Sequence, residues 1–186
     1  MPRTPLQFQN MKDERKLSIL ECSLPLFSLY GNKVSIDLIC SKAKCSHGLI
    51  YHYYKNTKDI FDDLLKSDTY NCLASKLIID DKNKKAEEQI REIISVLYSL
   101  KTIEEMSYAN IIISNEEKGG FVQNFIKLVK RGQKEEEITN GSPDSIAYCI
   151  ILLFKGIYLS YLTNKKANIK KPDIENIYEI FRKIYF

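Results

Sequence analysis

The sequence of 186 residues lacks the features that mark several large classes of protein. Its five cysteines, at positions 22, 40, 45, 72 and 149, are odd in number and form no C-x-x-C pair, so they do not indicate a disulfide framework. No window of eighteen apolar residues occurs, and no apolar run of signal-peptide length follows the first residues. We therefore expect reduced cysteines, a cytoplasmic protein, and neither secretion nor association with a membrane.

The signatures of catalysis are also missing. The sequence contains no nucleophile motif, no glycine-rich phosphate loop and no pair of carboxylates spaced for acid–base work. His47 and His52 are the only histidines, and they lie close to Cys40 and Cys45. This cluster could suggest zinc, but its spacings are not those of a closed structural zinc site. We predict no catalytic residue, no metal and no cofactor.

Positive charge is concentrated in the first third of the chain. Residues 1–58 contain nine Lys/Arg and four Asp/Glu, whereas the remaining residues contain nineteen and twenty. The whole excess of positive charge therefore lies in residues 1–58. Such an asymmetry predicts a segment that binds a polyanion, attached to a neutral body.

Apolar residues recur at helical spacing along most of the chain, and helix caps and breakers separate the runs. The pattern predicts an all-α fold of about nine helices without repeats. We expect Pro25 to kink the first helix and residues 1–10 to form a loose arm. The expected helices span residues 11–30, 36–43, 46–54, 57–79, 86–101, 104–115, 121–137, 143–164 and 173–185.

The stretch from Val34 to Lys58 predicts two short helices joined by a tight turn, the arrangement of a helix-turn-helix. Ser35 is suited to cap the first of these helices and Ser46 the second. In such a motif the second helix enters the major groove of DNA with its N-terminal residues at the base edges. Here those residues are His47, which can hydrogen-bond a base or a phosphate, and Gly48, which allows close approach of the backbone.

Other side chains of the motif can also contact the bases or the phosphates of DNA. Leu49 can contact a thymine methyl group, and Tyr51 and His52 can bind phosphate oxygens. Lysines supply positive charge at both ends of the motif. The candidate DNA-binding residues are Ser35, Lys44, Ser46, His47, Gly48, Leu49, Tyr51, His52, Lys55 and Lys58.

Several patterns at fixed spacing carry a resemblance to a known family: IL-x-x-x-x-x-LF at 19–27, Gly31, VS at 34–35, LICSKA at 38–43 and S-x-G-x-I-Y-x-x-Y at 46–54. This part of the chain resembles the DNA-binding domain of the TetR family of transcriptional regulators. Two positions depart from the family pattern. Lys44 replaces the usual turn glycine, so we expect a different turn or a strained residue. Thr57 replaces a phosphate-contacting lysine, a role that would fall to Lys55 or Lys58.

The resemblance implies a division of the chain into a flexible arm at 1–10, a helix-turn-helix DNA-binding domain at 11–56 and an effector-binding and dimerisation domain at 57–186. The helix 57–79 would be the connector. The stretch R-G-Q-x-E-x-E-I at 131–138 and Gly156 before an apolar run are similar to the family's effector domain. The resemblance further implies double-stranded DNA, a small and largely apolar effector, and a homodimer as partners.

The same resemblance implies candidate residues for effector binding and for dimerisation. The helices that usually surround the ligand cavity carry Tyr98, Met106, Tyr108, Phe125, Leu128 and Tyr158. The last two helices contain more apolar residues than one subunit needs, so we expect a dimer interface that includes Ile150, Phe154, Ile157, Tyr161, Ile177 and Phe181.

The expected function is a ligand-responsive repressor that binds a palindromic operator as a homodimer and leaves it when the ligand binds. Two alternatives stay open. The basic surface of the helix-turn-helix could bind a protein partner instead of DNA, or the helical fold could be that of an enzyme.

Overall fold

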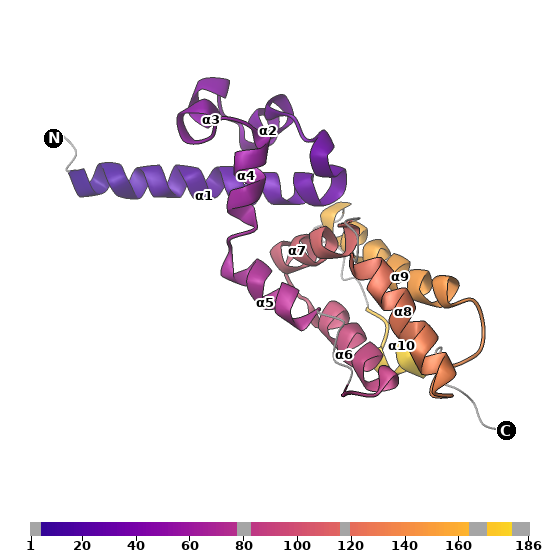
Figure 1. Ribbon diagram of the computed structural model, residues 1–186. Helices are drawn as coiled ribbons and strands as arrows, with labels where there is room; N and C mark the ends of the chain where they lie inside the picture. The colour runs from indigo at the N-terminus through magenta and orange to yellow at the C-terminus, as the bar shows by residue number, and fades with distance from the viewer. Residues whose placement is uncertain (1–4, 78–82, 116–119, 164–170, 180–186) are drawn as a thin grey trace. The chain divides into compact units, whose positions relative to one another are not determined.

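The computed structural model describes residues 5–77, 83–115, 120–163 and 171–179 (Figure 1). Over these residues the chain forms ten α-helices and one short 3-10 helix, without a β-strand. The prediction of an all-α fold is therefore confirmed. The chain divides into two compact units, Met1–Asn71 and Cys72–Phe186.

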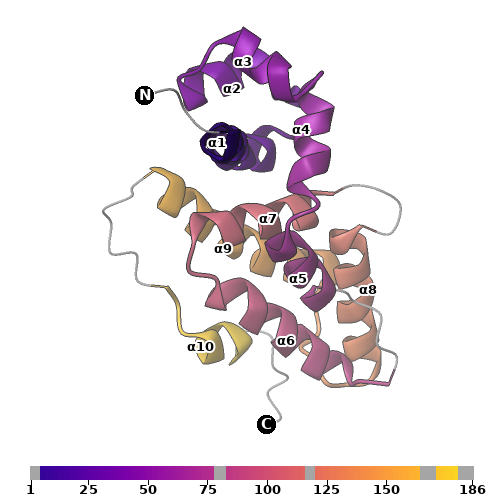
Figure 2. The same ribbon diagram turned by 90° about the vertical axis from the view of Figure 1, so that its left-hand side faces the viewer.

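The first unit is built around the long helix α1 (Pro5–Tyr30), which the short helix η1 (Gly31–Lys33) follows. Three short helices come next: α2 (Ile36–Ala43), α3 (His47–Tyr53) and α4 (Thr57–Leu64). Both α2 and α4 pack against α1, and α3 packs against α2 (Figure 2). Each of the four α-helices contributes buried apolar side chains to one core, among them Ile19, Leu24, Phe27, Ile39, Ile50, Ile60 and Leu64.

Two expectations for α1 need correction. The helix begins at Pro5, so residues 5–10, expected in a loose arm, are helical. Proline is compatible with the first turn of a helix, because its missing N–H has no partner there. The helical spacing of Leu17, Leu24 and Phe27 predicts that they share one buried face. Leu24 and Phe27 are buried, but Leu17 is 57% exposed.

The prediction of a single connector helix over 57–79 is wrong. Two helices, α4 and α5 (Asp68–Lys76), are separated by a turn in which the N–H groups of Lys66 and Ser67 bind the carbonyls of Asp63 and Leu64. The Ser67 hydroxyl then accepts a hydrogen bond from the N–H of Tyr70, which caps α5. The apolar spacing continues across this turn and hid the helix start that Ser67 provides.

The second unit contains α6 (Ala86–Ser99), α7 (Ile103–Ser114), α8 (Phe121–Lys134), α9 (Pro143–Thr163) and α10 (Ile174–Glu179). Helix α9 packs against α6, α7 and α8, and α10 packs against α6. The predicted start of α9 is confirmed, with Pro143 as its first residue and Ser142 accepting a hydrogen bond from the N–H of Ser145. The predicted last helix extends to residues 180–185, which lie outside the described residues.

By length and composition, α9 is the one helix among the described residues that could cross a membrane. Core helices of globular proteins commonly meet the same test. One stripe of α9 is indeed buried against its neighbours: Ala147, Ile150, Ile151, Phe154 and Tyr158.

Candidate nucleic-acid interface

Side-chain caps set the starts of the helices that carry the candidate interface. The Ser35 hydroxyl accepts a hydrogen bond from the N–H of Leu38 (3.2 Å) at the start of α2. The Ser46 hydroxyl accepts one from the N–H of Leu49 (3.3 Å) at the start of α3. Both caps agree with the sequence prediction, and each satisfies a backbone donor that a helix start leaves unpaired. The two serines are therefore occupied in shaping the motif.

The turn between α2 and α3 depends on Lys44, which adopts the left-handed conformation (φ 51°, ψ 48°). Its N–H and that of Cys45 both bind the carbonyl of Cys40, which ends α2. For a residue with a Cβ atom this conformation costs roughly 1 to 2 kcal/mol. The expectation of a strained residue in place of glycine is thus confirmed, and the turn keeps its tight geometry.

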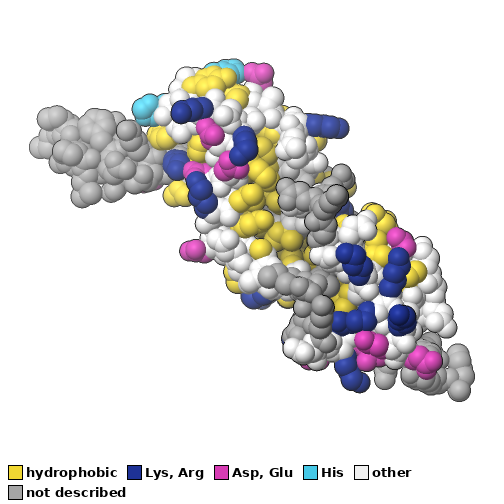
Figure 3. All heavy atoms as spheres, in the orientation of Figure 1, with side chains coloured by type: hydrophobic (Ala, Val, Ile, Leu, Met, Phe, Trp, Pro, Cys, Tyr) yellow, Lys and Arg dark blue, Asp and Glu magenta, His cyan; other side chains and the backbone are white. Residues whose placement is uncertain are grey.

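Helix α3 has a buried face and an exposed face. Ile50 is fully buried and Tyr54, just after the helix, is 5% exposed, so both anchor α3 in the core of the first unit. Leu49 is half-buried. The opposite face is exposed and presents His47, Gly48, Tyr51 and His52. Figure 3 shows histidine side chains on the surface of this unit, with lysine and arginine side chains near them.

His47 has a partner that the sequence did not reveal. Its Nε2 atom lies 2.5 Å from Oδ1 of Asp37, a residue in the first turn of α2. The contact fixes the imidazole at the start of α3 and places a carboxylate beside the residue expected to contact a base. No periodicity links two residues ten positions apart across a turn, so only the folded motif could show it.

The lysines around α3 differ in their surroundings. Lys44 and Lys55 are exposed, and neither side chain forms an ion pair within the described part of the chain. Lys58 instead pairs with Asp62 one turn later in α4, at 2.5 Å. Thr57 is half-buried at the first position of α4. Of the two lysines that could replace the family's phosphate contact, Lys55 thus has the charge without a carboxylate partner.

A cluster of charged side chains around the buried Tyr54 connects the end of α3 to the rest of the unit. Asp63 of α4 binds Nζ of Lys16 (2.6 Å) and of Lys66 (2.9 Å), and it accepts a hydrogen bond from the Tyr54 hydroxyl (3.1 Å). The hydrogen bonds from Lys16 and Lys66 lower the pKa of Asp63 to about 2. Burial, together with the charge of Asp63, raises the pKa of Tyr54 well above its ordinary value.

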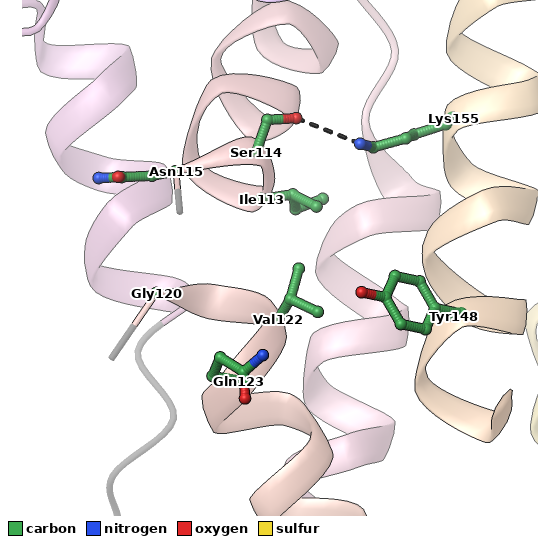
Figure 4. Close-up of a pocket in the computed structure, with 8 residues that line it drawn as sticks. All are labelled: Ile113, Ser114, Asn115, Gly120, Val122, Gln123, Tyr148 and Lys155. Atoms are coloured by element: carbon green, nitrogen blue, oxygen red, sulfur yellow. Dashed lines mark hydrogen bonds between the residues drawn. The ribbon is translucent and has the colours of Figure 1, made fainter. Parts of the chain in front are cut away.

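The six residues expected to surround a ligand, Tyr98, Met106, Tyr108, Phe125, Leu128 and Tyr158, are all buried in the core of the second unit. Tyr98 donates a hydrogen bond to the carbonyl of Ile150 (2.9 Å), and the Tyr158 hydroxyl is 2.8 Å from that of Ser107. The structure has a pocket of about 450 Å³ elsewhere in this unit, where the end of α7, the start of α8 and α9 meet (Figure 4). None of the six residues lines it, and their role in ligand binding stays a prediction.

The residues expected at a dimer interface differ in exposure. Ile150, Phe154 and Ile177 are buried in the unit's own core, so they are not available on its surface. Ile157 and Tyr161 are partly exposed, and Phe181 lies outside the described residues. The exposed apolar side chains of α9 belong to a neighbouring stripe, which we call the α9 stripe: Tyr148, Leu152, Leu153 and Leu159. Apolar residues on two adjacent faces of α9 made the choice of face ambiguous in the sequence.

Within the described ranges, no group of three or more His, Cys, Asp and Glu side chains is placed to hold a metal ion. The five cysteines are free thiols.

No protein-family model and no curated protein matches the sequence. Similar solved structures exist. The MbdR regulator from Azoarcus sp. CIB is 16% identical over 89% of this chain and 96% of its own, with a TM-score of 0.53. NalD, the secondary repressor of the MexAB-OprM multidrug efflux pump in Pseudomonas aeruginosa, is 16% identical over 94% and 100%, with a TM-score of 0.50. The SmeT–triclosan complex is 11% identical over 91% and 92%, with a TM-score of 0.51.

At such identities the likeness concerns the fold. The chain has the all-α fold of TetR-type transcriptional regulators, with a helix-turn-helix unit followed by a larger helical unit. The resemblance inferred from residues 19–54 is confirmed at this level. A shared fold does not determine function, which depends on the residues of the site.

Proposed function

We propose that the protein is a DNA-binding transcriptional regulator that reads its operator with the exposed face of α3. The observation that carries the proposal is the two-sided character of this helix. Ile50 holds it in the core, while His47, Gly48 and Tyr51 face solvent. Lys44 and Lys55 are exposed and form no ion pair with any residue that the structure describes. In helix-turn-helix proteins this face enters the major groove, and neighbouring basic side chains bind phosphates.

The proposal includes a homodimer that uses the α9 stripe. Leu152 is 62% exposed and Leu159 is 52% exposed, and a leucine side chain gains free energy when a partner covers it. Gly156 lies on the same exposed side, and a Cβ atom added there would meet nothing within 4 Å. A partner helix could therefore approach α9 closely at this point.

Repression relieved by a small molecule is the proposed mode of action. The fold is shared with NalD, a repressor, and with SmeT, whose structure contains triclosan. Ligand binding would favour a conformation in which the two α3 helices of the dimer no longer fit successive major grooves. The ligand can shift this equilibrium only by its difference in affinity for the two conformations, typically about 1 to 3 kcal/mol.

Selection of bound duplexes from a random pool tests the DNA-binding function. We expect a near-palindrome with half-sites spaced by about one helical turn, or a multiple of it, because a two-fold dimer presents its two recognition helices at that spacing. Recovery of sequences without two-fold symmetry, or binding without sequence preference, would contradict the proposal.

Three variants then assign roles on the selected operator. Lys55→Ala should weaken binding to all sequences and reduce the salt dependence by about one phosphate contact. Lys58→Ala is its matched control, with a smaller expected effect because Asp62 already pairs with that lysine. His47→Ala should instead relax the preference at particular base pairs. If all three bind like the parent protein, the interface lies elsewhere.

The two alternative functions predict different observations. A helical module that binds a protein through the same basic face would give no gel shift with operator-length DNA at physiological salt. An enzyme on this scaffold would convert a co-purified small molecule to product, whereas a regulator would only bind it.

A further inference from the structure

We infer that the pocket between α7, α8 and α9 binds a small organic anion, whose carboxylate or similar group pairs with Lys155. The inference rests on the proposed function, because it names the chemical class of the effector. The pocket has a volume of about 450 Å³, within the range of roughly 300 to 1,000 Å³ that small-molecule sites occupy. The described residues that line it all belong to the second unit.

Lys155 gives the pocket its charge. Its Nζ atom donates a hydrogen bond to the hydroxyl of Ser114 at 3.2 Å, drawn as a dashed line in Figure 4. Lys155 forms no ion pair with any residue that the structure describes, and the described lining contains no aspartate or glutamate. Among the described residues, the ammonium group therefore has a hydroxyl partner but no carboxylate partner.

The rest of the lining suits a ligand with a polar and an apolar part. Ser114, Gln123 and Tyr148 bring hydroxyl and amide groups that can donate hydrogen bonds to an anion, and the Tyr148 ring faces the pocket (Figure 4). Ile113 and Val122 supply apolar contact. A carboxylate attached to a short aromatic or aliphatic body matches both halves of this surface.

Other classes of ligand fit less well. A cation would be repelled by Lys155. A wholly apolar ligand would take water away from the ammonium group without giving it a partner, which costs free energy. An anionic ligand removes that penalty, and the exclusion of water strengthens its pairing with Lys155.

The position of the pocket links it to the proposed dimer. Tyr148 and Lys155 both lie on α9, and Tyr148 also belongs to the α9 stripe. A ligand that contacts Tyr148 in the pocket thus acts on a residue of the helix through which the subunits would associate. Through this contact, anion binding would change how the two subunits associate. It would thereby change the spacing of their two α3 helices.

Binding to matched pairs of compounds tests the assignment. Benzoate, phenylacetate, hexanoate and decanoate are each compared with the corresponding primary amide on the full-length protein, by calorimetry and ligand-observed NMR. We expect at least one carboxylate to bind about tenfold more tightly than its amide, and this advantage to disappear in Lys155→Met. It should persist in Lys155→Arg and in Lys127→Met, which removes an exposed lysine of α8 outside the pocket lining.

Circular dichroism establishes that each variant is folded. The inference is overturned if no carboxylate binds more tightly than its amide, or if the advantage survives in a folded Lys155→Met. Operator binding is measured separately. Anion binding that depends on Lys155 but leaves operator affinity unchanged would refute the effector role and keep the site, whereas a protein that binds the anion and no palindromic DNA would refute the proposed function alone.

Discussion

The hydroxyl of Tyr54 donates a hydrogen bond to Oδ2 of Asp63, and the same oxygen lies 2.6 Å from Nζ of Lys16. Tyr54 directly follows α3, Asp63 belongs to α4 and Lys16 to α1. One carboxylate therefore joins three helices of the first unit and fixes the end of the helix whose other end presents His47. The orientation of the proposed DNA-reading face depends on this contact.

Tyr54→Phe tests that dependence. Removing the hydroxyl deletes one hydrogen bond to a charged group, so we expect a loss of about 1 to 2 kcal/mol in stability and faster amide hydrogen exchange in α3 and α4. Tyr53→Phe is the control, since its ring contacts His52 and its hydroxyl has no hydrogen-bond partner among the described residues. Equal exchange rates in the two variants would show that the Tyr54 hydroxyl does not hold α3.

The depressed pKa of Asp63 predicts a change of stability with pH. Its pKa falls from 3.8 to about 2 on folding, so the ionised carboxylate stabilises the folded unit above about pH 4, and this contribution is lost as the pH falls toward 2. The contribution is about 2 kcal/mol. The difference in unfolding free energy between the parent and Asp63→Asn should therefore be largest near neutral pH and shrink below about pH 4. A constant difference down to about pH 2 would contradict this assignment.

The helix-turn-helix could be predicted in detail from the sequence because local signals define it. Ser35 and Ser46 cap helices as predicted, and Asn56 caps α4, which starts at the expected residue 57. The bounds of α2 are those expected. Capping depends on residues within three positions of one another, so a single sequence contains the needed information. The start of α5 at Ser67 was missed because a continuous apolar spacing outweighed the same kind of local signal.

Contacts between distant residues could not be predicted in this way. The pairing of His47 with Asp37 and the pocket around Lys155 bring together residues from separate helices. Helical periodicity says that a side chain is on the apolar face but not which neighbour covers it. For this reason Ile150 and Phe154 were expected at a dimer surface, although the subunit's own core buries them.

Because Lys44 adopts the left-handed backbone conformation, we expect its substitution by glycine to increase the stability of the first unit. Lys44→Gly relieves the contact of the Cβ atom with the backbone and should stabilise the first unit by about 1 kcal/mol, partly offset by the entropy of glycine in the unfolded chain. Lys44→Ala is the matched control, because it removes the same charge and keeps the Cβ atom. Thermal unfolding followed by circular dichroism compares them. If the lysine contributes only charge to DNA binding, operator affinity should fall equally in both variants. An unchanged melting temperature in Lys44→Gly would contradict the strain in the turn.

Gly132 lies close to Ile138 and Ala86 in the second unit. A Cβ atom at this position would lie 2.3 Å from Cδ1 and 2.5 Å from Cγ1 of Ile138, and 3.1 Å from Cβ of Ala86. Gly132→Ala should therefore destabilise this unit by about 1 to 3 kcal/mol, because buried atoms would have to move. Lys130→Ala is the control, since Lys130 lies on the same helix with an exposed side chain, so its truncation leaves the buried packing unchanged. Urea unfolding at equal protein concentration measures both, and equal midpoints would contradict the tight packing of Gly132.

Gly48 separates the stability of the motif from its fit to DNA. A Cβ atom there would meet only Oγ of Ser46, at 4.0 Å, so the fold can accept it. Alanine favours the helical conformation over glycine, and Gly48→Ala should raise stability by about 0.5 to 1 kcal/mol. If the backbone of α3 approaches the DNA at this point, the same methyl group should lower operator affinity by about tenfold, or about 1.4 kcal/mol. Full operator affinity in a more stable Gly48→Ala protein would place the closest approach to DNA at another residue of α3.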